Sequence, residues 1–170
     1  AERIDFQLED SEMAFAKALE LDPESDTARR GLAEMKRALS KPDEAAELYR
    51  QILAKDETSI PAQTGLILSL FEAGKRTEAE DAMTKSLDAN PGNVMLLAGA
   101  AYWYAAHNEA AKAILLAQKA IATDPRFIWS HIALARGYMA DKKPLDAEQV
   151  LLAARRYGNF PTLEYEIASA

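Results

Sequence analysis

The sequence repeats itself with a period of about 34 residues, and this period constrains the fold more than any other feature. An Asp-Pro or Asn-Pro step ends at Pro23, Pro91 and Pro125; the last two lie one period apart, and the first lies two periods before Pro91. The missing member falls at Glu57, which follows Asp56 and keeps the acidic residue before it. A period of about 20 to 50 residues is typical of arrays in which one short structural unit stacks on the next.

Setting the proline at repeat position 32 defines four full repeats at residues 26–59, 60–93, 94–127 and 128–161. A half repeat precedes them at 1–25, and a half repeat or capping helix follows at 162–170. Residues one period apart share their character in several columns. The columns are Ala45, Ala79, Ala113 and Ala147; Leu32, Leu66, Ala100 and Leu134; Lys36, Leu70, Tyr104 and Tyr138; and Phe15, Tyr49, Met83, Ala117 and Leu151. This agreement predicts a single array over 1–170.

Each repeat is predicted to form two helices with a break between them. Gly74 follows an apolar run and is predicted to end a helix in the left-handed conformation. Thr77 and Glu80 have the spacing of a capping box at the start of the next helix. The column Gly31, Gly65 and Gly99 predicts close helix approach, because Gly within a helix otherwise costs about 1 kcal/mol relative to Ala.

These columns resemble the signature of the tetratricopeptide repeat (TPR) family, in which a large residue, Leu-Gly, Tyr, Ala, an aromatic residue, Ala and Pro recur in each repeat unit. The sequence departs from the signature at Lys36 in the Tyr column and Glu57 in the Pro column, and it has Ala or Ile in place of the signature Gly. The resemblance implies an all-α fold, a right-handed superhelical solenoid of antiparallel helix pairs. It further implies a protein–protein interaction scaffold that is not an enzyme and needs no cofactor.

Composition excludes several other classes of function. A net charge of −7 and a pI near 4.9 oppose a basic surface, so we expect neither nucleic acid nor an anionic membrane as a partner. The longest weakly polar stretch, Val94 to Ala106, is well short of the about 20 residues that a membrane span needs, so we expect no membrane insertion. The alanine-rich, cysteine-free repeats resemble those of bacterial cytoplasmic or periplasmic proteins, although composition leaves the compartment open.

No residue pattern predicts catalysis or metal binding. The two histidines, His107 and His131, occupy different repeat positions, and neither belongs to a recognised ligand motif. The sequence has no Gly-rich phosphate loop, and its serines lie in predicted helices without a nucleophile motif. We therefore expect neither a catalytic residue nor a metal site.

The resemblance also implies a ligand-binding groove, because repeat positions 2, 5, 9, 12 and 13 usually face the concave side in this family. Near the N-terminal end these positions are charged, as at Arg30, Glu34 and Arg37. Further along they are apolar or aromatic, which is typical of a surface for an amphipathic helix or an extended peptide. The predicted peptide-binding residues are Leu68, Phe71, Met95, Tyr102, Trp129, Ile132, Arg136 and Met139.

Three alternatives to a peptide-binding groove remain at this point. The apolar residues are also consistent with burial against a further repeat or with self-association as a structural module. The third alternative is that the chain is a regulatory or substrate-recruiting segment of a larger enzyme. Both ends of the chain cut through a repeat, so we expect a window onto a longer array. Chaperone C-terminal tails are not expected as partners, because only Arg30 among ten matched positions of the family's carboxylate clamp carries a suitable donor.

Overall fold

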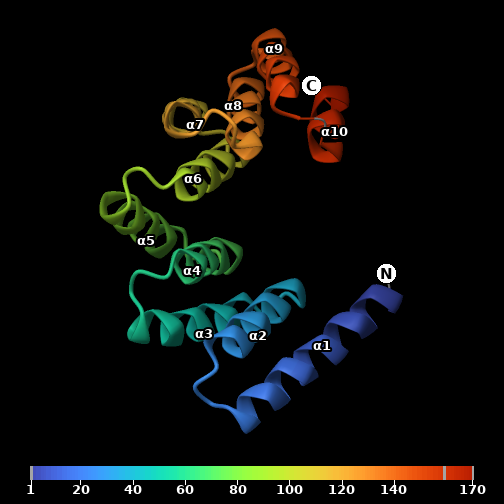
Figure 1. Ribbon diagram of the computed structural model, residues 1–170, viewed down its shortest axis with the longest axis vertical. Helices are drawn as coiled ribbons and strands as arrows, with labels where there is room; N and C mark the ends of the chain where they lie inside the picture. Colours follow the sequence, from blue (N-terminus) through green and yellow to red (C-terminus); the bar gives the residue numbers. More distant parts are fainter. Residues whose placement is uncertain (1, 159, 170) are drawn as a thin grey trace. The chain divides into compact units, whose positions relative to one another are not determined.

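The computed structural model describes residues 2–158 and 160–169, with side-chain burial for 7–158 and 160–168. Within these residues the chain is helical and contains no strand (Figure 1). The elements are α1 (Glu2–Leu21), α2 (Asp26–Ala38), α3 (Pro42–Lys55), α4 (Ile60–Glu72), α5 (Arg76–Ala89), α6 (Val94–Ala106), α7 (Ala110–Thr123), α8 (Ile128–Ala140), α9 (Pro144–Ala154), a 3-10 turn η1 (Arg155–Tyr157) and α10 (Pro161–Ser169). The all-α prediction with two helices per repeat is confirmed.

Contacts divide the chain into two compact units, residues 1–86 and 87–170, which are called unit 1 and unit 2 below. The division falls inside α5. The first helices of the four repeats, α2, α4, α6 and α8, are equally long and begin at the predicted repeat boundaries. Helix α10 begins at Pro161, one position before the expected boundary at 162.

The turn inside each repeat places one residue in the left-handed conformation. Its φ angle is 58° at Ser40, 72° at Gly74, 59° at Asn108 and 59° at Lys142, so the four residues lie one period apart. The prediction for Gly74 is therefore confirmed. The capping-box prediction is wrong, because α5 already begins at Arg76 and the Glu80 carboxylate accepts hydrogen bonds from the Arg76 guanidinium at 3.0 and 3.1 Å.

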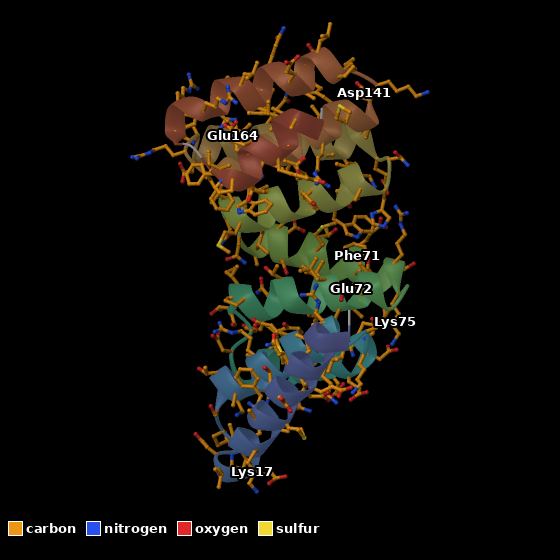
Figure 2. All side chains as sticks on the ribbon, turned by 90° about the vertical axis from the view of Figure 1, so that its right-hand side faces the viewer. Lys17, Phe71, Glu72, Lys75, Asp141 and Glu164 are labelled. Atoms are coloured by element: carbon orange, nitrogen blue, oxygen red, sulfur yellow. The ribbon has the colours of Figure 1, made fainter. Side chains whose placement is uncertain are left out.

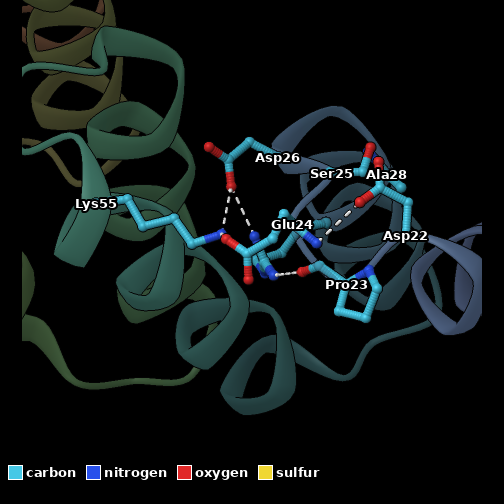
Figure 3. Close-up of polar contacts among 8 residues, drawn as sticks. Asp22, Pro23, Glu24, Ser25, Asp26, Ala28 and Lys55 are labelled. Atoms are coloured by element: carbon cyan, nitrogen blue, oxygen red, sulfur yellow. Dashed lines mark hydrogen bonds and ion pairs between the residues drawn. The ribbon is translucent and has the colours of Figure 1, made fainter.

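Three of the loops between repeats use an aspartate in the same way. In the first loop the Asp22 carboxylate accepts a hydrogen bond from the backbone N–H of Glu24, and the Ser25 hydroxyl accepts one from Ala28 at the start of α2 (Figure 3). Asp56 and Asp124 accept equivalent bonds from residues 58 and 126. Asx turns of this kind satisfy backbone N–H groups that the helices leave unpaired.

A second recurring bond fixes these loops, and no sequence pattern predicts it. The side chain at repeat position 4 donates to the backbone carbonyl six positions earlier, from Arg29 to Pro23, from Gln63 to Glu57 at 2.6 Å and from His131 to Pro125 at 2.8 Å. The three donors are chemically different. What they share is a buried or half-buried place above the loop, where an unpaired carbonyl would be costly.

Small residues allow the helices to pack closely. Ala45, Ala79, Ala113 and Ala147 are all fully buried, as the alanine column predicts. A Cβ atom added to Gly31 would overlap the Phe15 ring, and one added to Gly65 would overlap the Tyr49 ring, which confirms close approach at both glycines. At Gly99 an added Cβ would meet no atom of unit 2 within 4 Å, and close approach there stays a prediction.

Candidate functional site

The predicted groove residues are divided between the two units. Leu68 and Phe71 lie on α4 in unit 1. Met95 and Tyr102 lie on α6, and the remaining four, Trp129, Ile132, Arg136 and Met139, lie on α8, all in unit 2. Each unit is therefore described by itself.

In unit 1 both predicted residues are half-buried, and an ion pair lies beside them. Phe71 packs against the core cluster of Ala46, Leu70 and Ala79. Its neighbour Glu72 accepts two hydrogen bonds from Arg37, at 2.5 and 2.8 Å (Figure 2). The hydrogen bond to Glu72 raises the pKa of Arg37, with burial acting in the opposite direction. The apolar side chain of Phe71 is thus partly covered by the core of unit 1 itself.

In unit 2 the structure brings three of the predicted residues together. The rings of Tyr102 and Trp129 meet edge to face, with their centroids 6.4 Å apart and an angle of 77° between their planes. The Arg136 guanidinium lies over the Tyr102 ring at 4.5 Å from its centroid. Such contacts hold large side chains in fixed positions, which reduces the entropy that a ligand's binding must overcome.

Arg136 has an acidic partner outside the predicted groove residues. Glu166 of α10 accepts hydrogen bonds from Arg136 at 2.6 and 3.2 Å, and its side chain is only 12% exposed. The hydrogen bond to Glu166 raises the pKa of Arg136, and burial opposes this effect. In the predicted register residue 136 is at repeat position 9 and residue 166 is at position 5 of the following half repeat, so both belong to the positions expected to face the groove; the register was the signal that could have found this contact.

The six unit 2 residues differ in their exposure. Met95, Trp129 and Met139 are 57%, 49% and 40% exposed, and Tyr102 and Arg136 are half-buried. Ile132 is completely buried in a cluster with Leu163 of α10. Five of the six side chains are therefore accessible at the surface in this structure, whereas Ile132 is buried.

A hollow of about 290 Å³ lies between the C-terminal ends of α6 and α8. Most of its lining residues are apolar, and Arg136 and Met139 come from the predicted set. The full lining is Ala105, Ala106, Asn108, Arg136, Met139 and Ala140.

Two properties of the described residues bear on other kinds of site. Among them no three His, Cys, Asp or Glu side chains come together as metal ligands. None of the helices in the described part of the chain is both long and apolar enough to cross a membrane.

A sequence profile described as tetratricopeptide repeat matches residues 7–60 and 64–126, which together make up more than half of the chain. The chain belongs to the tetratricopeptide repeat family. No curated protein matches the sequence.

Solved structures of other TPR proteins share the fold. The TPR protein TTC0263 of Thermus thermophilus is 19% identical, with a TM-score of 0.76 over 98% of this chain and 95% of that one. YrrB, whose structure is described as a TPR protein with an unusual peptide-binding site, is 16% identical, with a TM-score of 0.64 over 96% of this chain and 84% of that one. Yeast Tom70 is 17% identical, with a TM-score of 0.80 over 93% of this chain and 34% of that one. At these identities the likeness shows the fold alone.

The one donor that matched the family's carboxylate clamp lies beside an acidic neighbour. Arg30 of the first full TPR repeat is 3.8 Å from the carboxylate of Glu34, one helical turn further along α2. An exposed pair at this spacing is weak, so it neither blocks nor builds a clamp. That chaperone tails do not bind this TPR protein stays a prediction.

Proposed function

TPR proteins are protein-interaction scaffolds, and we propose that this one binds a peptide or a partner helix on unit 2. The proposed site is the α6–α8 face, defined as Met95, Tyr102, Trp129, Arg136 and Met139 together with the hollow beside Arg136. Leu68 and Phe71 remain a separate prediction for unit 1.

One observation carries the proposal: large apolar side chains are exposed next to a hollow that is lined by both apolar and polar groups. Exposing Trp129 and two methionines to water is unfavourable, and a partner that covers them removes this cost. Trp is also the residue type most often found among the few that dominate binding energy, and methionine side chains adapt to differently shaped partners.

The first test is Trp129→Ala. We expect this change to weaken binding of a captured partner by about 2 kcal/mol, because a hot-spot Trp contributes at least that much. About half of the side chain is exposed, and circular dichroism checks that the variant keeps its fold. Partners are captured from cell extract with the wild-type chain and with the variant, and the affinity of each captured protein is then measured by titration.

A matched control is Leu115→Ala with Leu145→Ala, on α7 and α9, because these leucines are 67% and 72% exposed but lie outside the α6–α8 face. The control is expected to bind the partner as the wild type does. Equal affinity for wild type and Trp129→Ala, with both folded by circular dichroism, would contradict the proposal.

Self-association through the same face is the competing hypothesis. It predicts that the molecular mass in sedimentation equilibrium rises with concentration and that Trp129→Ala reduces this rise. A monomer at every concentration removes it.

A further inference from the structure

Sulfur occurs in this chain only in methionine, and the five methionines differ sharply in their exposure. Met13 is 64% exposed, and Met95 and Met139 of the α6–α8 face are exposed as described above. Met83 is 3% exposed, and Met35 is half-buried. The sequence has no cysteine thiol that would react with an oxidant first. Because oxidation of a thioether follows the access of the oxidant to sulfur, the three exposed methionines are open to it and Met83 is protected.

Two of the three exposed methionines belong to the α6–α8 face. Met95 lies in the first turn of α6, one period before Trp129, so these two side chains occupy the same repeat position. Met139 lies in the last turn of α8 and lines the hollow. Met13 lies on α1 in unit 1 and is not part of the face. A chemical change at the two sulfurs therefore alters the face directly, and Met13 provides an internal reference.

The hollow offers donors to an oxidised Met139. Its lining includes the guanidinium of Arg136 and the amide of Asn108. The guanidinium has five N–H groups, and its Nε and Nη2 atoms donate to Glu166, which leaves further N–H groups on the same side chain. A sulfoxide oxygen is a hydrogen-bond acceptor and carries no net charge. The polar part of this lining is therefore compatible with the sulfoxide, whereas the packed surroundings of Met83 are not.

The oxidation needs one co-reactant, a hydroperoxide. A lone pair of the methionine sulfur attacks one oxygen of hydrogen peroxide, so the S–O bond forms as the O–O bond breaks. The thioether loses two electrons and becomes a sulfoxide, and the departing oxygen takes up the proton of the transferred oxygen and leaves as water. A sulfoxide reductase reverses the change with two electrons from a dithiol and releases the oxygen as water.

We propose that Met95 and Met139 are sites of reversible oxidation by hydroperoxides, and that their sulfoxides weaken binding at the α6–α8 face. The proposal rests on the proposed function, because it names a regulation of the same face. Methionine oxidation replaces a flexible apolar side chain by a polar one, so the face loses two of its five contact residues as apolar surface. Both sulfurs lie on exposed side chains, so the core of unit 2 keeps its packing.

The first test needs no partner. The folded full chain is treated with hydrogen peroxide, and sulfoxide formation at each methionine is followed over time by peptide mass spectrometry. We expect Met13, Met95 and Met139 to be oxidised at least about tenfold faster than Met83, because only their sulfurs are accessible. Oxidation of Met83 as fast as that of Met95 and Met139 would overturn the assignment of the two sites.

The second test measures binding before and after oxidation. The chain is treated with peroxide, the peroxide is removed, and the partner captured in the test of Trp129→Ala is titrated. We expect the affinity of the wild type to fall at least about fivefold, because apolar contacts are lost, and to return after treatment with a methionine sulfoxide reductase and dithiothreitol.

Each variant is compared only with its own untreated form. Met95→Leu with Met139→Leu removes both sulfurs from the face in a swap that conserves side-chain volume, and its affinity is expected to be the same before and after peroxide. Met13→Leu keeps both sulfurs and is expected to lose affinity on oxidation as the wild type does. An unchanged wild-type affinity once both sulfoxides have formed, or an equal fall in the double leucine variant, overturns the inference.

The two proposals fail in different ways. If Trp129→Ala weakens the captured partner but oxidation does not, the proposed function stands and the redox control falls. If Trp129→Ala leaves binding unchanged, the proposed function falls and the redox control of binding falls with it, whereas the peroxide rates still decide whether Met95 and Met139 are oxidation sites.

Discussion

The two units contain the same repeat but are held together by different chemistry. Unit 1 carries 19 acidic and 12 basic residues, a net charge of −7, and unit 2 carries eight of each. In unit 1 ion pairs join different helices and turns, as between Lys36 of α2 and Glu12 of α1, Arg37 of α2 and Glu72 of α4, and Lys75 in the turn before α5 and Asp43 of α3. In unit 2 the helices meet mainly through alanine, leucine and aromatic side chains.

One column illustrates this difference. Tyr104 and Tyr138 occupy it in unit 2, and Leu70 and Lys36 occupy it in unit 1. The Lys36 ammonium lies 2.6 Å from the Glu12 carboxylate and 2.5 Å from that of Glu44, so it joins α1, α2 and α3 where an aromatic ring would otherwise pack. The repeat geometry thus accommodates either chemistry in this column.

The largest difference between the units is expected at their glycines. Gly65→Ala places a methyl group inside the Tyr49 ring, and we expect it to lower the free energy of unfolding by about 2–3 kcal/mol through overpacking. Gly99→Ala meets no atom within 4 Å and is expected to stabilise by up to about 1 kcal/mol through helix propensity. Urea unfolding of both variants measures the two changes. Effects of the same sign and size would show that the two positions do not differ in packing.

A smaller effect is expected from the ion pairs of unit 1. Lys36→Met removes the ammonium that joins Glu12 and Glu44, while Lys41 still donates to Glu12. We expect a loss of about 1.5 kcal/mol, at the lower end of the usual range for a hydrogen bond to a charged group. Hydrogen exchange separates the units, and protection should fall in α1 to α3 but not in α6 to α9. Equal loss of protection in both units would contradict the comparison.

The same network predicts how stability depends on pH. The hydrogen bond from Lys36 lowers the pKa of Glu12 below 4.5, so this carboxylate stabilises the fold above that pH and the contribution is lost as the pH falls through the lowered pKa. The hydrogen bond to Glu12 raises the pKa of Lys36 above 10.5, so its contribution is lost only as the pH rises beyond that value. Acid titration followed by hydrogen exchange should weaken α1 to α3 in the wild type, and less so in Lys36→Met.

The smallest effect is expected to be the same in both units. Ser40 and Lys142 have positive φ angles of 58° and 59°, which strain a residue with a Cβ atom. Ser40→Gly and Lys142→Gly should each stabilise by about 0.5–1 kcal/mol, because Gly adopts this conformation without the steric cost. Thermal unfolding measures both changes. A gain in one unit only would mean that the turn geometry, unlike the packing, is not shared.

Much of the fold could be predicted from the sequence, because residues that recur with the period mark positions where every repeat has the same packing requirement. Alanine at 45, 79, 113 and 147 is required wherever two helices cross closely, so the column predicts full burial at all four. The starts of α2, α4, α6 and α8 follow from the same period. Thr77 and Glu80 have the correct local spacing for a capping box, but the prediction is wrong because the repeated turn ends earlier and α5 begins at Arg76. The Glu80 carboxylate accepts a hydrogen bond from Arg76 instead.

The site was less predictable, because it depends on departures from the period. The connection from η1 to α10 is one position shorter than those from α3 to α4, α5 to α6 and α7 to α8, so α10 begins early. Glu166 of this helix meets Arg136, and Tyr165 is exposed. Similarly, Ile132 belongs to the predicted groove by its repeat position but is buried because Leu163 shares its cluster.

The sequence by itself determined the repeat, its helices, the alanine crossings and the apolar character of α6 and α8, because a periodic structure must place equivalent residues in equivalent surroundings. Only the tertiary structure decided which of those apolar side chains stay exposed, which acid neutralises Arg136 and where α10 rests. These outcomes depend on contacts between residues far apart in the chain, such as Arg136 and Glu166, whose hydrogen bonds the repeat pattern does not specify, so three-dimensional packing had to fix them.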